Sequence, residues 1–339
     1  MPHCLITGAS GFVGSNLTRR LLREGWQVSG LVRSDQQADA LRGGGAAAVS
    51  GSLDDRASLR RACAGTDVVF HVAGRTRALR YAEYHRDNVE GTRALAQAAA
   101  AQSNPPVLVL VSSLAAGGPA TCARPRTEAD PEQPLSDYGR SKLDAERAAA
   151  EAADALPLSV VRPPIVFGPG DRAGLAMYRG MKVLPVHPTP GWRPLPISLV
   201  YVDDLCEALL AVACRGERRP AAATRDPQHR GEGVYYVTAE RDITYGEMGK
   251  LAAAAAGWAV VPVPLPRLAF RLAGLLGEAI GRWRGVPAVV NRDKAREALA
   301  PGWVASAEKI RGHLGFAPAA PLEQRFATTV SWYCKEGWL

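Results

Sequence analysis

Tyr138 and Lys142 are four residues apart, a spacing that places two side chains on the same face of a helix. A free phenol has a pKa of about 10 and is a poor acid-base catalyst at neutral pH. A nearby ammonium group favours the phenolate. The pair could therefore move a proton to or from a substrate oxygen. Because this spacing is common by chance, the interpretation needs support from other parts of the chain.

A glycine-rich turn stands near the N-terminus, at residues 8–14, directly after the apolar run Cys4–Ile6. Leu17, Leu21 and Leu22 then give the next segment the apolar face of a helix. A glycine turn between a strand and a helix lets backbone N–H groups approach a pyrophosphate, and the helix N-terminus adds partial positive charge. The spacing Gly-x-x-Gly-x-x-Gly is one residue longer than the usual fingerprint between its first two glycines. An ordinary strand-to-helix turn is therefore the alternative for this segment alone.

Arg33 directly follows the second expected strand, Val28–Val32. In dinucleotide-binding folds the residue at this tip meets the adenosine ribose. An acidic side chain there accepts from the 2′-OH, whereas an arginine accommodates a 2′-phosphate. Arg33 therefore favours NADP(H). NAD(H) stays open as the alternative because Asp35 follows two residues later.

Alternating strand and helix patterns position these residues. Val107–Val111 is typical of a buried parallel strand, and it ends at Ser112 and Ser113, where side chains of such sheets reach a ligand crevice. The alternation predicts an α/β fold, a doubly wound parallel Rossmann sheet over residues 1–167. Residues 168–339 are expected to form a smaller, mostly helical substrate lobe that also returns strands and helices to the core.

Six motifs in order resemble the extended short-chain dehydrogenase/reductase family, in its epimerase/dehydratase-like branch. Dihydroflavonol-reductase-like and 3β-hydroxysteroid-dehydrogenase-like proteins of that branch are the nearest analogies. The resemblance covers nearly the whole chain. The motifs are Thr7-Gly8-x-x-Gly11-x-x-Gly14, His71-Val72-Ala73-Gly74, Asn88-Val89-Glu90-Gly91-Thr92, Ser113 with Tyr138 and Lys142, Arg162-Pro163 through Gly168-Pro169, and Val202-Asp203-Asp204-Leu205.

The resemblance implies a catalytic set. Tyr138 would exchange the substrate oxygen's proton, and Lys142 would lower the tyrosine pKa and bind the nicotinamide ribose. Ser113 would hold and polarise the carbonyl, and Asn88 would orient a proton-relay water. Ser112 is the alternative serine; Ser113 is preferred because it lies five residues before a glycine, at the distance usual in the family.

The resemblance also implies a set of cofactor-binding residues drawn from the glycine turn and the strand ends. They are Gly8, Ser10, Gly11, Phe12, Val13, Gly14, Arg33, Ser52, Leu53, Ala73, Gly74, Lys142, Pro163 and Val166.

Three positions depart from the family pattern. Ser52 stands where an acidic residue often contacts adenine, and Gly117 stands where a tyrosine is common. Ile165 stands where nucleotide-sugar enzymes usually carry an asparagine that contacts the substrate phosphates. An isoleucine cannot make that contact, which favours a less polar substrate.

Three functions compete. The leading one is an NADPH-dependent oxidoreductase that reduces a ketone or aldehyde of a moderately apolar small molecule, or oxidises the matching alcohol. The second is a nucleotide-sugar epimerase or dehydratase that recycles its cofactor internally, against which Ile165 argues. The third is a non-catalytic NADP-binding module, against which the intact Ser113, Tyr138 and Lys142 set argues.

Composition agrees with an enzyme of this kind. The 339 residues can bury a large core, and no apolar run reaches membrane-spanning length. The six cysteines show no metal-type pairing, so we expect no metal site and reduced thiols in a cytoplasmic protein without a signal peptide. The net charge is +8, but the arginines are scattered and no nucleic-acid motif is present. We therefore expect a small-molecule substrate, no nucleic acid, and a homodimer.

Two later segments have no role in this scheme. Residues 215–233 are rich in Arg, Pro, Ala and Gly and predict a mobile surface loop. Residues 267–283 predict an amphipathic helix with a broad apolar face. Packing of that face on the core of the lobe is the favoured interpretation. The alternatives are an apolar roof over the substrate and a contact with a membrane surface, which would collect a lipid-like substrate.

Overall fold

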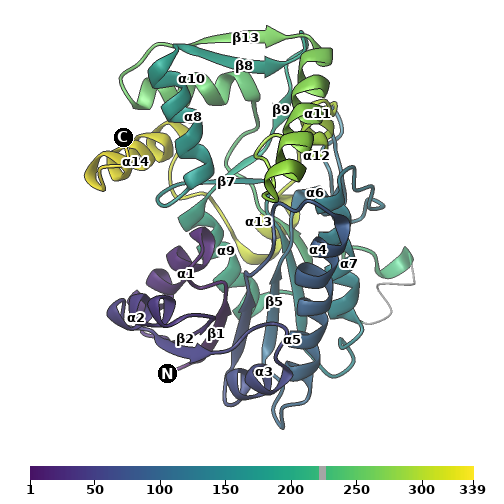
Figure 1. Ribbon diagram of the computed structural model, residues 1–339. Helices are drawn as coiled ribbons and strands as arrows, with labels where there is room; N and C mark the ends of the chain where they lie inside the picture. The colour runs from purple at the N-terminus through teal and green to yellow at the C-terminus, as the bar shows by residue number, and fades with distance from the viewer. Residues whose placement is uncertain (221–226) are drawn as a thin grey trace.

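A computed structural model describes residues 1–220 and 227–339 (Figure 1). Within these residues, seven strands form one parallel sheet in the order β11-β6-β5-β4-β1-β2-β3. The strands are β1 (His3–Thr7), β2 (Gln27–Val32), β3 (Ala47–Ser50), β4 (Val68–His71), β5 (Val107–Val111), β6 (Leu158–Arg162) and β11 (Val234–Tyr236). The doubly wound sheet predicted from the alternating pattern is confirmed.

Helices cover both faces of this sheet, as Figure 1 shows. Ile6 and Phe70 point into one apolar core with α1 (Phe12–Arg23) and α9 (Val202–Arg215), and α2 (Asp35–Gly43) lies on the same side. Leu5 and Val69, their chain neighbours, point into the opposite core with α3 (Arg56–Cys63), α5 (Gly91–Ala100) and α7 (Asp137–Ala150). Strands buried on both faces explain why these runs are continuously apolar.

The strand order reverses between β1 and β4, and ligands of such sheets bind outside the carboxyl ends of the strands at this point. Two buried side chains join the ends of β1 and β4. Thr7 Oγ1 lies 2.6 Å from His71 Nδ1, and His71 Nε2 lies 2.8 Å from Thr92 Oγ1 on α5. Burial, helped by the charge of Lys142, lowers the pKa of His71 to about 3. A neutral imidazole thus fixes the floor of the crevice.

The second half of the chain builds a lobe above the carboxyl edge of the sheet (Figure 1). Its core is aromatic, with Phe167 stacked on Phe326 at 4.5 Å between ring centroids. Its elements are β7 (Ile165–Phe167), α8 (Arg172–Val183), β8 (Val186–Pro190), β9 (Pro196–Ile197), β10 (Leu199–Tyr201), β12 (Ile243–Thr244), α10 (Tyr245–Ala255), β13 (Val261–Leu265), α11 (Arg267–Arg284), α12 (Arg292–Ala298) and α14 (Leu322–Lys335). Shorter elements elsewhere are α4 (Tyr81–Tyr84), the π-helix η1 (His85–Glu90), α6 (Leu114–Gly117), the 3-10 turn η3 (Pro227–His229) and α13 (Glu308–Leu314).

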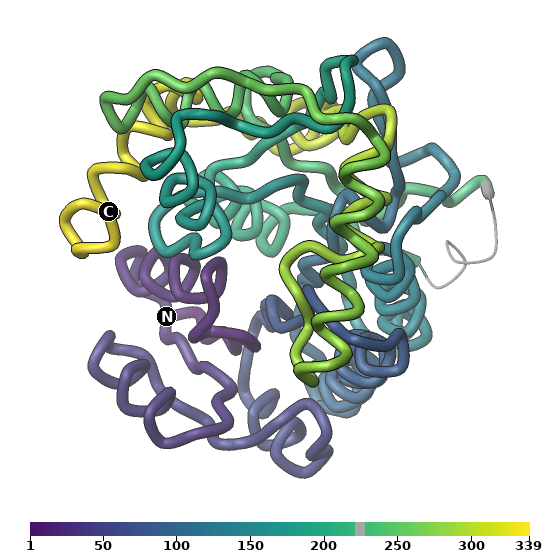
Figure 2. The backbone as a smooth tube through the Cα atoms, turned by 45° about the horizontal axis from the view of Figure 1, so that its top comes forward, coloured from purple at the N-terminus to yellow at the C-terminus, as the bar shows by residue number. Residues whose placement is uncertain are grey.

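Helix α11 forms where the amphipathic pattern predicts it, but its apolar face points away from the core of the lobe. Its buried residues are Gly274 and Gly281, whereas its leucines are exposed. A Cβ on Gly277 would lie 1.9 Å from the Val290 carbonyl oxygen, so the glycines allow close packing on the chain that leads into α12. The expectation that its apolar face packs on the core of the lobe is therefore wrong. Figure 2 shows α11 and α12 reaching from the lobe towards the sheet domain.

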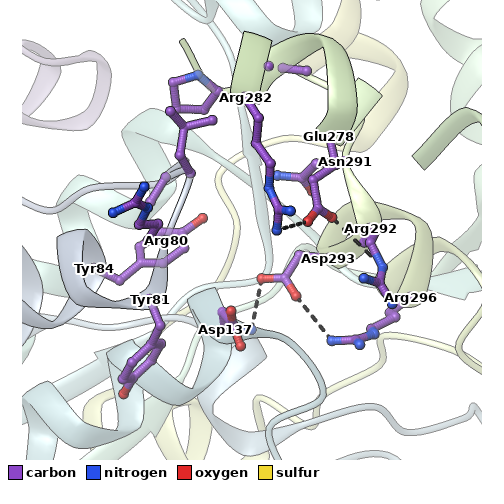
Figure 3. A pocket seen from close by; sticks show the side chains of 15 residues that line it. Arg80, Tyr81, Tyr84, Asp137, Glu278, Arg282, Asn291, Arg292, Asp293 and Arg296 are labelled. Atoms are coloured by element: carbon purple, nitrogen blue, oxygen red, sulfur yellow. Dashed lines mark hydrogen bonds and ion pairs between the residues drawn. The ribbon is translucent and has the colours of Figure 1, made fainter. Parts of the chain in front are cut away.

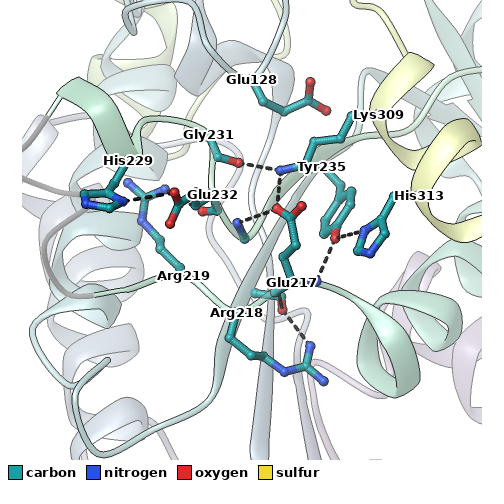
Figure 4. A network of polar contacts seen from close by, with 12 residues as sticks. Glu128, Glu217, Arg218, Arg219, His229, Gly231, Glu232, Tyr235, Lys309 and His313 are labelled. Carbon is teal, nitrogen blue, oxygen red and sulfur yellow. Dashed lines mark hydrogen bonds and ion pairs between the residues drawn. The ribbon is translucent and has the colours of Figure 1, made fainter.

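The ends of the loop expected at residues 215–233 are held by polar contacts (Figure 4). Lys309 Nζ lies 2.6 Å from Glu217 Oε2 and donates to the Gly231 carbonyl at 2.7 Å. The Glu217 N–H donates to the Tyr235 hydroxyl, and Arg218 donates to the carbonyl oxygen of Val212. Residues 221–226, the centre of the predicted mobile loop, lie outside the described residues.

Candidate active site

The glycine turn joins β1 to α1 at the reversal of strand order. Gly8 has φ +73°, a conformation that favours glycine, and a Cβ on Gly14 would lie 2.1 Å from the Gly8 carbonyl oxygen. Gly11 precedes the helix and offers no side-chain cap to its first N–H groups. Ser10 and Gly11 are exposed, while Phe12 and Val13 are half-buried. Uncapped N–H groups over a side-chain-free turn fit the diphosphate of a dinucleotide.

Two distant segments border this turn. A Cβ on Gly8 would lie 2.8 Å from the Ala73 nitrogen, so the chain after β4 passes directly beside it. Asn16 donates to the carbonyl oxygens of Phe12 and Pro169, at 2.9 and 3.0 Å. Asn16 ties the loop after β7 to the turn, a role that the sequence analysis missed. A buried polar residue in the first helix after a glycine turn was the only available signal.

The residues expected to meet adenosine lie along the same edge of the sheet, at the ends of β2 and β3. Arg33 is exposed, its N–H donates to Gln37 Oε1 at 3.0 Å, and its guanidinium makes no hydrogen bond or ion pair with the residues that the structure describes. Ser52 is half-buried, and its carbonyl accepts from Ser58 Oγ at 3.5 Å. Leu53 packs against Gly91, where a Cβ would lie 3.0 Å from its Cδ1.

Tyr138 and Ser113 come together at the carboxyl end of β5. Ser113 caps α6 by accepting the Ala115 N–H at 3.1 Å, and its hydroxyl lies near the phenol of Tyr138, the second residue of α7. Burial raises the pKa of Tyr138, while Lys294 and the Ser113 hydrogen bond oppose that rise. The phenol therefore holds its proton beside a serine hydroxyl, which is the arrangement of a proton donor.

Lys142 and Asn88 both lie beside Gly74. A Cβ on Gly74 would lie 3.5 Å from Lys142 Nζ and 3.4 Å from Asn88 Oδ1. Lys142 is buried and donates to the Val111 carbonyl at 2.7 Å. Burial lowers the pKa of Lys142 to about 8, with the charge of Glu146 opposing the change.

Asn88 lies within the π-helix η1, and its amide is fully oriented. Its Oδ1 accepts the Arg75 N–H at 2.6 Å, and its Nδ2 donates to the Arg75 carbonyl and to Ser141 Oγ at 3.0 and 2.9 Å. π-Helical turns are common at functional sites because they displace one residue from the regular helix face. Here the turn aligns Asn88 with Lys142.

A second lysine reaches Tyr138 from the lobe. Lys294 Nζ lies 5.5 Å from the centroid of the Tyr138 ring and 2.7 Å from Glu297 Oε2. Glu297 Oε1 accepts from Ser136 Oγ at 2.6 Å, and Asp293 Oδ2 accepts the Asp137 N–H at 2.8 Å. Helix α12 thus docks on the first turn of α7. These residues were not predicted from the sequence, because no local pattern reveals a contact across more than 150 positions.

A buried ion pair lies beneath the catalytic candidates. Arg162 donates to Glu146 at 2.6 and 2.9 Å and to the Tyr236 hydroxyl at 3.2 Å. Burial opposes the charge of Arg162, but Glu146 and the other partners hold its pKa well above the usual range. Ser112 donates to the same Glu146 carboxylate. Of the two candidate serines, Ser113 contacts Tyr138 and Ser112 belongs to this ion pair.

The remaining predicted residues border the crevice from the lobe. Pro163 is buried and its carbonyl accepts the Leu114 N–H at 2.8 Å, beside Ser113. Val166 is half-buried, and Ile165 is 42% exposed. A cavity of about 280 Å³ opens near Tyr138, between the loop before α4 and helices α11 and α12 (Figure 3). Tyr84, which lines it, lies 6.2 Å from the Tyr138 ring, centroid to centroid.

Three further properties bear on the chemistry of the described residues. All six cysteines are free. No group of three or more His, Cys, Asp or Glu side chains among those described is placed to hold a metal ion. No helix in the described ranges has the length and apolar character needed to cross a membrane.

Known proteins share this sequence pattern and fold. Residues 4–222 match the model of the NAD dependent epimerase/dehydratase family. The chain is 32% identical over 338 residues to a ceramide reductase of Caulobacter vibrioides, covering 98% of this chain and 95% of the relative. It is 30% identical over 324 residues to 4-hydroxy-2-methyl-3-oxo-4-farnesyl-3,4-dihydroquinoline-1-oxide ketoreductase of Stigmatella aurantiaca, covering 92% and 91%.

A solved structure of similar fold is MoeE5 in complex with UDP-glucose and NAD. It has a TM-score of 0.71, 24% identity, and coverage of 98% of this chain and 99% of the other. The match of the family model over more than half of the chain, joined to two nearly full-length relatives, establishes the class of protein. The chain belongs to the NAD dependent epimerase/dehydratase family and is an NAD(P)-dependent oxidoreductase of the extended short-chain dehydrogenase/reductase type.

Proposed function

We propose that the protein is an NADPH-dependent reductase of a ketone or aldehyde on a moderately apolar small molecule, or the dehydrogenase of the matching alcohol. The observation that carries this proposal is the meeting of Ser113 and Tyr138 at the carboxyl end of β5, where the serine hydroxyl lowers the pKa of the phenol. A carbonyl oxygen placed against both hydroxyls would be polarised by one and protonated by the other.

The glycine turn fits the diphosphate of the cofactor, which supplies or accepts the hydride when bound. The Gly11 N–H closes the turn by donating to the Gly8 carbonyl at 2.9 Å, and the uncapped N–H groups of the first turn of α1 would face the phosphates. The proposal of NADP(H) over NAD(H) rests on the exposed Arg33 guanidinium at the tip of β2. A 2′-phosphate there would accept charge-assisted hydrogen bonds.

The other residues prepare the proton transfer. Burial keeps Tyr138 protonated, so its phenol can donate to the substrate oxygen in the direction of reduction. Lys142 holds its ammonium beneath the crevice and would bind the nicotinamide ribose. Asn88 Oδ1 accepts one hydrogen bond and has a second lone pair, which suits a relay water.

Two observations support an apolar substrate. Ile165 is exposed on β7, at the place where nucleotide-sugar enzymes usually carry an asparagine, and an isoleucine there can bind only apolar groups. The two nearly full-length relatives are named as reductases of a ceramide and of a farnesyl-bearing quinoline oxide. Both names describe a substrate with a large apolar part.

NADPH oxidation with a panel of ketones, aldehydes and sterols tests this function directly. We expect turnover with apolar ketones, and thermal stabilisation by those ketones or the matching alcohols in the presence of NADP⁺. UDP- and dTDP-sugars serve as the contrasting ligands. Strong stabilisation by a nucleotide sugar, with none by apolar ketones or alcohols, would instead support an epimerase or dehydratase with internally recycled cofactor.

Assembly and compartment are separate proposals. The free thiols support the reducing cytoplasm as the compartment. The expected homodimer stays a prediction, and light scattering of the purified protein would measure it.

A further inference from the structure

Helix α11 presents an unpartnered apolar face. Leu276 is 64% exposed and Trp283 is 84% exposed, although both belong to residue types that fold into cores or interfaces. The exposed apolar side chains recur every three or four residues along one side of the helix: Leu268, Leu272, Leu275, Leu276, Ile280 and Trp283. A stripe of this extent marks an interaction surface, because isolated exposed leucines would not align.

The opposite side of the helix packs closely against the rest of the protein. Gly274 and Gly281 are buried, and Cβ atoms there would lie 2.8 Å from Ala295 Cβ and 3.1 Å from the Ala288 nitrogen. The helix therefore cannot turn its leucines inward without losing this close packing. The buried glycines set the orientation of the helix, and the apolar face therefore points outward.

The charges that flank the apolar face are mostly positive. Helix α11 carries four arginines and one acidic residue, Glu278. Glu278 accepts from Arg282 at 2.6 Å, so its charge is neutralised locally. Arg271 and Arg284 are exposed and make no hydrogen bond or ion pair with any residue in the described ranges. The net field of this surface is therefore complementary to an anionic one.

Two exposed tryptophans lie on or near α11. Trp283 lies in the last turn of α11. Trp192 is 76% exposed in the loop after β8, where the preceding Gly191 donates to the Leu265 carbonyl at 2.9 Å and contacts Arg267. The loop that bears Trp192 therefore lies beside the first turn of the helix. Tryptophan is enriched where a membrane meets water, because its ring is apolar and its N–H is polar.

We propose that α11 and Trp192 form a docking surface for a bilayer that contains anionic phospholipid. The helix lies in the plane of the interface, with its leucines and tryptophan among the lipid chains and its arginines at the headgroups. Outward leucines, flanking arginines and a tryptophan in the last turn are the composition of such a helix, and one neutralised carboxylate does not oppose it.

A cavity adjoins the inward side of α11. Gly281 and Arg282 of α11 line the cavity of about 280 Å³ that Tyr84 and Asp137 also line (Figure 3). Tyr84 stands beside Tyr138. The docking itself does not depend on the proposed reaction, since it rests on the outer face of the helix.

Vesicle flotation tests the docking surface. The full chain is mixed with vesicles of phosphatidylcholine alone, or with vesicles in which about a third of the lipid is phosphatidylglycerol, an anionic lipid. We expect binding to the anionic vesicles that weakens in about 0.5 M salt, where charges are screened beyond a few ångströms. The double variant L276E/W283E should reduce the bound fraction on the order of tenfold or more, because two apolar contacts become two repelled charges.

Matched controls separate docking from folding. Val183 at the end of α8 is 87% exposed and apolar, so Val183→Glu should bind vesicles like the wild type. Arg271→Gln should weaken binding to the anionic vesicles while leaving the circular dichroism spectrum and melting temperature unchanged. Both L276E/W283E and Val183→Glu should also keep the wild-type spectrum, because these side chains face solvent.

Two results would overturn the inference. One is a wild-type protein that stays with the aqueous fraction for both vesicle compositions. The other is a wild-type dimer that L276E/W283E converts to a monomer without any vesicle binding, which would assign this face to a second copy of the chain. Neither result depends on whether the protein reduces ketones.

Discussion

Tyr138 lies between opposing influences, and their balance sets the pKa of its phenol. Burial raises its pKa, while Lys294 and the Ser113 hydrogen bond lower it. Lys142, the expected partner, donates to the Val111 carbonyl and has its own pKa lowered to about 8 by burial. The site thus has two lysines with separate tasks, one beneath the crevice and one beside the phenol ring.

The catalytic assignment predicts a split between binding and turnover. Tyr138→Phe removes the phenolic proton and should lower kcat by about 10²–10⁴, the usual scale for a positioned acid-base group, while NADP(H) binding stays nearly intact. Lys142→Ala should damage both, because its ammonium has two proposed contacts. Calorimetry with NADP⁺ and steady-state rates measure the two effects. A Phe variant with near-wild-type turnover would refute the assignment.

Lys294 predicts a pH effect with a definite sign. Its charge, 5.5 Å from the Tyr138 ring, favours the phenolate, so Lys294→Met should raise the tyrosine pKa further. Alcohol oxidation needs the phenolate, and its pH profile should therefore move to higher pH. Lys294→Arg keeps the positive charge and should restore the wild-type profile. Unchanged profiles in both variants would make Lys294 a purely structural residue.

Arg33 predicts the choice of cofactor. Charge-assisted hydrogen bonds to a phosphate contribute about 1.5–3 kcal/mol, so NADPH should bind about ten- to a hundredfold tighter than NADH. Arg33→Ala should remove that difference by weakening NADPH binding alone. Calorimetry with both cofactors decides the matter. An equal affinity in the wild type would shift attention to Asp35, in the first turn of α2.

At the scale of elements, His71 is a buried side chain whose hydrogen bonds connect β1, β4 and α5. Its burial makes the free energy of unfolding depend on pH in a predictable way. Its native pKa is about 3, below the unfolded value of 6.5, so the unfolded state binds the extra proton first as pH falls. The stability that the neutral imidazole contributes is therefore present above pH 6.5 and is lost progressively down to about pH 3. The free energy of unfolding falls by about 1.4 kcal/mol per pH unit, and by roughly 2 kcal/mol between pH 6.5 and 5.

His71→Gln tests the contribution of this imidazole to the pH dependence of stability. Glutamine can keep a hydrogen bond to Thr7 or Thr92 but does not titrate, so the variant should lose about 2 kcal/mol less stability than the wild type between pH 7 and pH 5. Urea unfolding at each pH provides the measurement. Between pH 7.5 and 8.5 the histidine is neutral in both states, and the two proteins should show the same slope. An equal loss in acid would show that other groups control acid unfolding.

Element boundaries close to the glycine turn and the serine strand were predictable from local pattern. The strand Val107–Val111 has the bounds that its apolar run predicts, and the alanine-rich segments form α5 and α7. The docking of α12 on α7 was not predictable, because the Ser136–Glu297 contact spans more than 150 positions and each partner looks like an ordinary surface residue. Local pattern reports how an element is built but not which distant element it meets.

Helix α11 shows the same limit in another form. Its amphipathic pattern correctly predicted a helix with one apolar face, but it could not tell a face packed on a core from a face left outside. The deciding information was in Gly274, Gly277 and Gly281, which recur on the opposite side and allow close backbone packing there. A glycine stripe opposite a leucine stripe is thus a sequence signal for an outward apolar face.

At the scale of the whole molecule, the predicted site draws its polar groups from the sheet domain and an apolar side chain from the lobe. Ser113, Tyr138 and Lys142 come from the sheet domain, whereas Ile165 comes from the first strand of the lobe. A substrate would therefore be fixed at one end by hydrogen bonds and selected at the other by apolar contact. This division predicts how activity should vary with substrate size.

Activity should rise with the apolar size of the ketone. Burying about 200 Å² of apolar surface at about 25 cal/mol per Å² gives roughly 5 kcal/mol before entropic costs. Because association also costs translational freedom, micromolar binding requires the hydrogen bonds of Ser113 and Tyr138 in addition. A series of ketones with lengthening apolar tails should therefore show falling KM at nearly constant kcat, since the added contact is equal in the ground and transition states.

Ile165→Asn isolates the contribution of the lobe to this trend. The variant places a polar amide where a 42% exposed isoleucine now offers only apolar contact, so it should flatten the dependence of KM on tail length. Small water-soluble ketones, which do not reach β7, should be reduced as before and act as the internal control. If KM fell with tail length as steeply in the variant as in the wild type, Ile165 would lie outside the substrate path.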